Sequence, residues 1–83
     1  MQLAKYVKFR EEKFGGVLFE TKSEKVYTLT PTAAAVVQEI SAGCAPEEIA
    51  PRLLQRFEGP AAAIEREVKA FIAELRDKGL VEG

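Results

Sequence analysis

The sequence of 83 residues contains no histidine and only one cysteine, Cys44. Without histidine the chain lacks the commonest general base and the commonest protein ligand of transition metals. A lone cysteine cannot form an intrachain disulfide, and there is no second cysteine to complete a metal site with it. A reactive thiol would also need a basic neighbour to lower its pKa, so we interpret Cys44 as a neutral, structural thiol. Carboxylates and lysines remain available for chemistry, but the usual catalytic and metal-binding residues are missing.

A strong charge of either sign is also absent, because 12 basic residues stand against 13 acidic ones and leave a net charge of −1. This balance argues against tight electrostatic binding of DNA or RNA. No apolar run approaches the roughly 20 residues that a membrane-spanning helix needs, and the N-terminal segment lacks the apolar stretch of a signal peptide. We therefore expect a cytoplasmic protein without a membrane partner. The length and the 47% of hydrophobic residues predict a single globular domain, residues 1–83.

What the sequence contains instead is three strand-like segments near its N-terminus. Residues 5–11 alternate between apolar and polar side chains, as in a half-buried strand. Residues 14–20 are apolar on both faces, as in a central strand, and residues 25–30 are rich in β-branched and aromatic side chains. The short polar links between the segments predict an antiparallel meander. Gly15 and Gly16 predict either a bulge or the close approach of another backbone.

Three helices are predicted after the strands. Thr30 can cap the first helix through its hydroxyl, and a proline follows at the first helical position, so this helix covers residues 31–42. A second helix covers residues 46–59, although Pro51 predicts a kink or a short first turn within it. A third helix covers residues 60–78. The order β-β-β-α-α-α predicts an α+β fold, a three-stranded antiparallel sheet followed by three helices, that is winged helix-turn-helix-like.

The third of these helices carries an apolar stripe at helical spacing. Ile64, Val68, Phe71 and Leu75 are expected in the core, and Ile72 is expected at the margin of the stripe. Charged side chains flank the stripe on both sides. They form either a solvated face or a set of partners for the charged side chains of a bound peptide.

The two edges of the expected sheet differ in charge. The 5–11 strand carries several charged side chains, which discourage pairing with a further strand. The 25–30 strand is uncharged after Lys25, so its exposed amides and carbonyls could accept an extended peptide as a fourth strand. Two alternatives remain open at this stage. The third helix or the C-terminal residues cover this edge, or the edge pairs with a second copy of the chain to form a homodimer.

A winged-helix DNA-binding regulator is a further alternative, because a fold of this type does not settle function. Arg52 and Arg56 on the second helix are the candidate DNA contacts. Residues 31–59 nevertheless carry these two arginines against four glutamates, and the third helix also contains several acidic residues. This charge distribution is a poor match for nucleic acid, which is therefore the less favoured partner.

Four segments taken together resemble PqqD and the PqqD-like domains, which are also called RiPP recognition elements. The segments are VYTLTPTAAAVVQEI at residues 26–40, the G-x3-EEIA opening at residues 43–50, FIAELRDKGLV at residues 71–81 and FGGVLFE at residues 14–20. The resemblance covers nearly the whole chain. It departs from the family pattern at Ala45, where members often have a capping threonine or serine, and at Pro51 inside the second helix.

The resemblance implies a non-catalytic protein of winged helix-turn-helix fold, with no catalytic residues, no metal ligands and no cofactor. Members of this family bind the leader segment of a ribosomally made precursor peptide and deliver it to a modifying enzyme. For PqqD that enzyme is a radical S-adenosylmethionine (radical SAM) protein. The implied context is the biosynthesis of pyrroloquinoline quinone (PQQ) or of a related peptide-derived product.

The resemblance also implies where the leader peptide binds. In the family the leader adds as a strand to the third strand and lies in the groove beside the third helix. Carried onto this chain, the strand contributes Val26, Tyr27, Thr28 and Leu29, and the groove side of the helix contributes Val68, Lys69, Ile72 and Arg76. Main-chain hydrogen bonds would supply much of the affinity, and pockets for alternate peptide side chains would supply the specificity.

Overall fold

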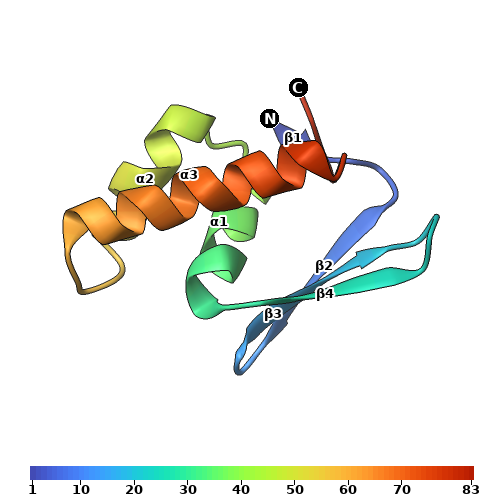
Figure 1. Ribbon diagram of the computed structural model, residues 1–83, viewed down its shortest axis with the longest axis horizontal. Coiled ribbons are helices and arrows are strands. Elements are labelled where there is room, and N and C mark those ends of the chain that lie inside the picture. The colour runs from blue at the N-terminus through green and yellow to red at the C-terminus, as the bar shows by residue number, and fades with distance from the viewer.

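The computed structural model describes every residue, Met1–Gly83, as a small sheet beside a cluster of three helices (Figure 1). The elements in chain order are β1 (Gln2–Leu3), β2 (Val7–Glu12), β3 (Gly15–Glu20), β4 (Lys25–Leu29), α1 (Pro31–Ser41), α2 (Pro46–Leu54), α3 (Ala61–Asp77) and β5 (Val81–Glu82). Strands β2, β3 and β4 form an antiparallel sheet in that order. The α+β class and the three-stranded meander predicted from the sequence are confirmed, with two short strands added near the ends of the chain.

Alternation along the strands gives this sheet two different faces. On the face toward the helices, Phe9 pairs with Leu18, and Leu18 is only 1% exposed. In the neighbouring row on the opposite face, Lys8 pairs with Phe19 and Phe19 pairs with Val26, and both of these apolar side chains are exposed. A register shift of one residue would exchange the two faces, so the burial of Leu18 keeps the strands in this pairing.

Gly15, the first residue of β3, lies against the end of β4. A Cβ atom at Gly15 would stand 2.2 Å from the carbonyl oxygen of Leu29 and 2.6 Å from the carbonyl carbon of Thr30. The φ angle of Gly15 is +143°, which side chains rarely adopt. Of the two explanations that the sequence offered for this glycine, close approach of another backbone is confirmed, and β2 and β3 pair without a bulge.

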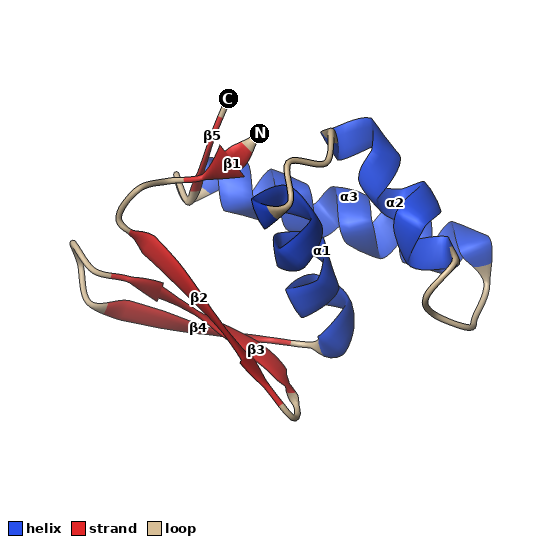
Figure 2. Cartoon of the chain, turned by 180° about the vertical axis from the view of Figure 1, so that it is seen from behind, coloured by secondary structure: helices blue, strands red, loops and turns tan.

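Helix α1 is the central element of the fold, between the sheet and the other two helices (Figure 2). Thr30 caps it as predicted, because its hydroxyl accepts a hydrogen bond of 3.2 Å from the N–H group of Ala33. The residues from Ala33 to Val37 are all buried, and Ile40 is 1% exposed. A helix that is apolar on nearly every side is stable only when it is surrounded, and this one fills the core that the sheet, α2 and α3 enclose.

The two ends of the chain meet in a second, two-stranded sheet that the sequence did not predict. Strand β1 pairs with β5, with Leu3 opposite Val81, and the N–H group of Ala4 donates to the carbonyl of Leu80. Strands of two residues are too short to show the alternation on which strand prediction depends. The expected return of the C-terminal residues to the core is confirmed, since Leu80 is 1% exposed.

Helix α2 is shorter than predicted, because it ends at Leu54 rather than near Gly59. The N–H groups of Arg56 and Phe57 both donate to the carbonyl of Leu53, each at 2.9 Å, and this shared acceptor closes the helix. Pro51 lies exposed within α2, and the helix continues through it. None of the three helices combines the length and the apolar composition needed to cross a membrane.

One charged residue, Glu39, is buried, and it forms an ion pair that links α1 to α2. Glu39 on α1 is 7% exposed, and its carboxylate accepts a hydrogen bond from the guanidinium of Arg52 on α2. This hydrogen bond raises the pKa of Arg52 above its usual value, with further help from the charge of Glu39. The ion pair therefore satisfies a carboxylate that would otherwise be buried without a partner.

Replacing Arg52 by leucine is expected to lower the free energy of unfolding, because the Glu39 carboxylate then loses its partner. Replacing both Glu39 and Arg52 by leucine should lower it less, since no charge is left at the buried position. Urea denaturation of the single and double variants at neutral pH measures both values. A double variant that is less stable than Arg52→Leu would contradict this role for the ion pair.

Candidate functional site

The outer edge of β4 has no backbone partner in the folded chain. No backbone hydrogen bond outside the helices and strands involves any residue from Lys25 to Leu29. Strand β4 pairs with β3 alone, and β5 pairs with β1. The alternative in which the C-terminal residues cover this edge therefore does not occur in the structure.

The register identifies which groups of β4 point outward. The N–H group of Thr21, at the end of β3, donates to the carbonyl of Tyr6 on the β2 side at 2.9 Å. Because backbone groups alternate in direction along an antiparallel strand, every second residue of β3 from Gly16 then points toward β4. Their partners on β4 are residues 25, 27 and 29. Val26 and Thr28 are the residues that present N–H and C=O groups at the free edge.

A groove runs between this edge and α3. It consists of two hollows of about 340 and 310 Å³, which share Thr28, Leu29, Phe71 and Glu74. The first hollow is further lined by Leu18, Val26, Tyr27, Leu75, Lys78 and Leu80, and the second by Thr30, Ala33, Glu67 and Ala70. The groove thus has an apolar floor, one wall of backbone from β4 and one wall of side chains from α3.

The side of α3 that faces the groove differs from the side that the sequence suggested. Val68 is 2% exposed in the core, and Ile72 is 7% exposed rather than marginal. Lys69 and Arg76 border a separate hollow next to the start of α2. Phe71, which was expected in the core, is only half-buried and lines the groove. Helical spacing shows that a stripe exists, but the packing of α1 and α2 decides where its centre lies.

This placement predicts losses of stability of different size for two neighbouring residues. Ile72→Ala should lower the free energy of unfolding by about 2–5 kcal/mol, because it empties a core position. Phe71→Ala should lower it less, by about 1–2 kcal/mol, since part of that ring is already exposed to water in the groove. Thermal unfolding of both variants measures the difference. A larger loss for Phe71→Ala than for Ile72→Ala would contradict the placement of the two side chains.

The four predicted strand residues lie together on β4. Val26, Tyr27, Thr28 and Leu29 all line the hollow beside α3. They share this groove with a set of α3 residues that the sequence-based choice of face missed, namely Glu67, Ala70, Phe71, Glu74 and Lys78. Those α3 residues recur every three or four positions, which is the signal that marks one helix face. A helix has several such faces, so spacing alone did not select this one.

The arginines considered for DNA contact are engaged with α1. Arg52 pairs with Glu39, and a terminal nitrogen of Arg56 donates to the side-chain oxygen of Gln38 at 3.2 Å. Cys44 is partly buried in the link before α2, and this burial raises the pKa of its thiol above the usual value. A thiol with a raised pKa stays protonated at neutral pH, as expected of a structural cysteine.

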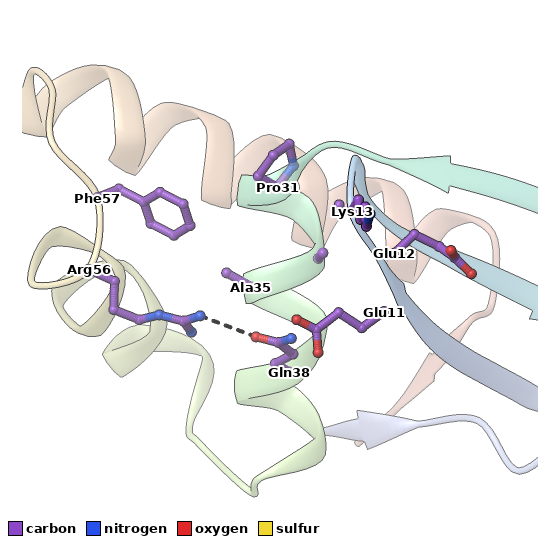
Figure 3. Close-up of a pocket in the computed structure, with 10 residues that line it drawn as sticks. Glu11, Glu12, Lys13, Pro31, Ala35, Gln38, Arg56 and Phe57 are labelled. Atoms are coloured by element: carbon purple, nitrogen blue, oxygen red, sulfur yellow. Dashed lines mark hydrogen bonds between the residues drawn. The ribbon is translucent and has the colours of Figure 1, made fainter.

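A smaller hollow of about 210 Å³ lies between the turn that joins β2 to β3 and the helices (Figure 3). Its labelled side chains include Glu11, Lys13, Gln38, Arg56 and Phe57, and the bond from Arg56 to Gln38 crosses one side of it. The volume is below the range typical of small-molecule sites. No group of three or more His, Cys, Asp or Glu side chains gathers to hold a metal ion here or elsewhere in the molecule.

Comparisons with known proteins find structures of the same fold. The chain is similar in structure to "TbiB1 in Complex with the TbiA(beta) Leader Peptide", with a TM-score of 0.85 and 22% identity over 100% of this chain and 96% of that one. It is also similar to "Lasso peptide synthetase B1 complexed with the leader peptide", with a TM-score of 0.81 and 26% identity over 99% of this chain and 96% of that one. No protein of curated function matches it in sequence. The family model described as "Coenzyme PQQ synthesis protein D (PqqD)" matches residues 15–81, and the chain therefore belongs to the PqqD family.

Proposed function

We propose that this chain is a non-catalytic recognition domain that binds the leader segment of a ribosomally made precursor peptide. The observation that carries the proposal is the unpaired edge of β4 beside the groove of α3. Similarity to lasso peptide synthetase B1, whose structure holds a leader peptide, supports it, as does membership of the PqqD family. An edge that offers backbone groups next to an apolar groove is suited to strand addition.

The leader peptide binds as a fourth strand alongside β4. The outward N–H and C=O groups of Val26 and Thr28 pair with its backbone, which supplies affinity for peptides of many sequences. Alternate side chains of the peptide point into the groove toward Leu29 and Phe71 and supply the specificity. Antiparallel addition continues the pattern of the existing sheet and is slightly more stable per residue than parallel addition.

The gain for the pathway is proximity rather than catalysis. A leader held on the domain raises the local concentration of the attached core peptide at a bound enzyme, to roughly millimolar for a short flexible tether. The partner implied by the family resemblance is a radical SAM enzyme acting in the biosynthesis of PQQ or of a related peptide product. Precursor peptides are made by ribosomes, so the domain works in the cytoplasm.

The proposal is tested by NMR titration of the ¹⁵N-labelled chain with the short precursor peptides encoded near its gene. The amide resonances of Val26 to Thr30 should shift, together with that of Phe71. The amide resonances of β2, at the opposite edge of the sheet, should not change. Binding that moves other residues while the β4 amides remain unchanged would contradict strand addition at this edge.

The oligomeric state of the free chain is the matching control. A second copy could use the same β4 edge, and a self-paired edge would not be open to a peptide. The mass in solution is therefore measured over a wide range of protein concentration, with and without peptide. A dimer that saturating peptide does not dissociate, together with β4 amide resonances that the peptide does not shift, would place the β4 edge in a homodimer instead.

A further inference from the structure

The groove beside β4 carries opposite charges at its two ends. The hollow that reaches Thr30 is bordered by the carboxylates of Glu67 and Glu74. The hollow that reaches Val26 contains Lys78, and Glu74 lies where the two hollows meet. The Lys78 ammonium stands 5.9 Å from the centre of the Tyr27 ring, which places this charge on the β4 side of the groove. The groove therefore runs from an acidic end at Thr30 to a basic end at Val26.

The separation of these charges matches the length of a short strand. From Glu67 to Lys78 the helix rises by about 16 Å. The five residues of β4 extend over a similar length, about 16 Å. A peptide paired along β4 passes both ends of the groove and turns every second side chain toward α3. Three successive groove-facing side chains of the peptide thus meet three different environments.

Apart from the Glu74 carboxylate, the environment between the charged ends is apolar. Leu29 and Phe71 line both hollows, and Leu29 is 4% exposed, so it forms part of the floor. Ala33 and Ala70 border the same region with methyl groups only, which leaves room for a large side chain. An apolar side chain of the peptide at this point would leave water and contact the Phe71 ring.

Building on the function proposed above, we propose that the groove selects leader peptides whose groove-facing residues read basic, apolar, acidic from N- to C-terminus. A peptide that is antiparallel to β4 enters beside Thr30 and leaves beside Val26. Its first groove-facing residue meets Glu67, with Glu74 beyond it at the junction of the two hollows, and its last meets Lys78. The reverse order places like charges together at both ends, so the groove discriminates against it as well as favouring the matched order.

The test is a selection of random peptides displayed on phage, carried out on the wild-type chain and on the charge-reversed variant Glu67→Lys, Glu74→Lys, Lys78→Glu. All three positions are exposed, so both proteins are expected to fold, and circular dichroism verifies it. The wild-type chain should enrich the basic–apolar–acidic order and the variant the opposite order. Exposed ion pairs are individually weak, so each protein should prefer its own peptides by about tenfold at low salt.

A matched control is Glu65→Lys, which raises the net charge as much as the triple variant does. Glu65 is exposed and borders neither hollow of the groove. It should enrich the same peptides as the wild-type chain. If Glu65→Lys changes the preferred order as the triple variant does, overall charge rather than the groove is responsible, and the inference is overturned.

Selected peptides are then titrated into the labelled wild-type chain, which separates the inference from the function on which it rests. Peptides that shift the β4 amides and share the basic–apolar–acidic order support both. Peptides that shift the β4 amides but share no charge order overturn the inference and leave the proposed function intact. Selected peptides that bind without shifting the β4 amide resonances overturn the proposed function, and the inference with it.

Discussion

Replacing Thr28 by proline is expected to weaken the binding of a precursor peptide by about 10- to 100-fold. Proline removes the N–H group that Thr28 presents at the free edge of β4, and it leaves a carbonyl of the peptide without its donor. A lost hydrogen bond costs about 0.5–1.5 kcal/mol, and an unsatisfied buried partner raises the loss to about 1–3 kcal/mol. Each 1.4 kcal/mol corresponds to tenfold in the dissociation constant, about the range expected. Isothermal titration calorimetry of the variant measures it.

The folded state should tolerate this proline, because Thr28 lies on an edge strand and uses its outward N–H group for no internal bond. Glu11→Pro is the matched control, since it places proline at an outward-facing position on the opposite edge, in β2. It should leave peptide binding unchanged. Equal losses of binding in both variants would mean that the sheet as a whole, and not the β4 edge, is required.

Replacing Gly15 by alanine is expected to lower the free energy of unfolding by about 4 kcal/mol or more. The new methyl group would lie 2.2 Å from the carbonyl oxygen of Leu29 and 2.6 Å from the carbonyl carbon of Thr30. Both obstacles are backbone atoms, so no side chain can rotate away to make room. A loss of this size is a large share of the whole stability of a small domain, and urea denaturation measures it.

Gly59→Ala separates the clash from the strain in the backbone. Gly59 has a φ of +138°, close to the +143° of Gly15, but a Cβ atom at Gly59 would meet nothing within 4 Å. Its replacement should therefore cost only the conformational strain, about 1–3 kcal/mol. If the two alanine variants lose the same stability, the new methyl group at residue 15 does not clash with the end of β4, and the close approach of the two strands is wrong.

Most of the fold could be predicted from local patterns in the sequence. The alternation in the first two strands, the threonine before Pro31 and the apolar stripe of α3 each depend on residues close together in the chain. Those signals identified the meander, the start of α1 and the extent of α3. The end of α2 was predicted less well, because the apolar Phe57 continued the stripe past Leu54. The shared bonds to the Leu53 carbonyl that close this helix have no signature in the sequence.

For the candidate site, too, the sequence indicated one part and left another undecided. Val26 to Leu29 were predicted as a docking edge because an uncharged strand without proline is visible in the sequence, and these residues line the groove. The facing side of α3 was not identified. Phe71 and Ile72 are adjacent, both apolar and both compatible with the stripe, so only their environment separates them. In the folded chain Ile72 packs into the core, while Phe71 reaches the groove beside β4.

By itself, the sequence determined which segments become strands and helices, how the strands follow one another and which strand can serve as an edge. These properties depend on short-range periodicity and on capping, which act within a few residues. The tertiary structure alone decided that the β4 edge is open, that Gly15 touches the end of β4, and that Glu67 and Lys78 stand at opposite ends of one groove. These features depend on contacts between segments far apart in the chain, where packing in three dimensions selects among faces that local patterns leave equivalent.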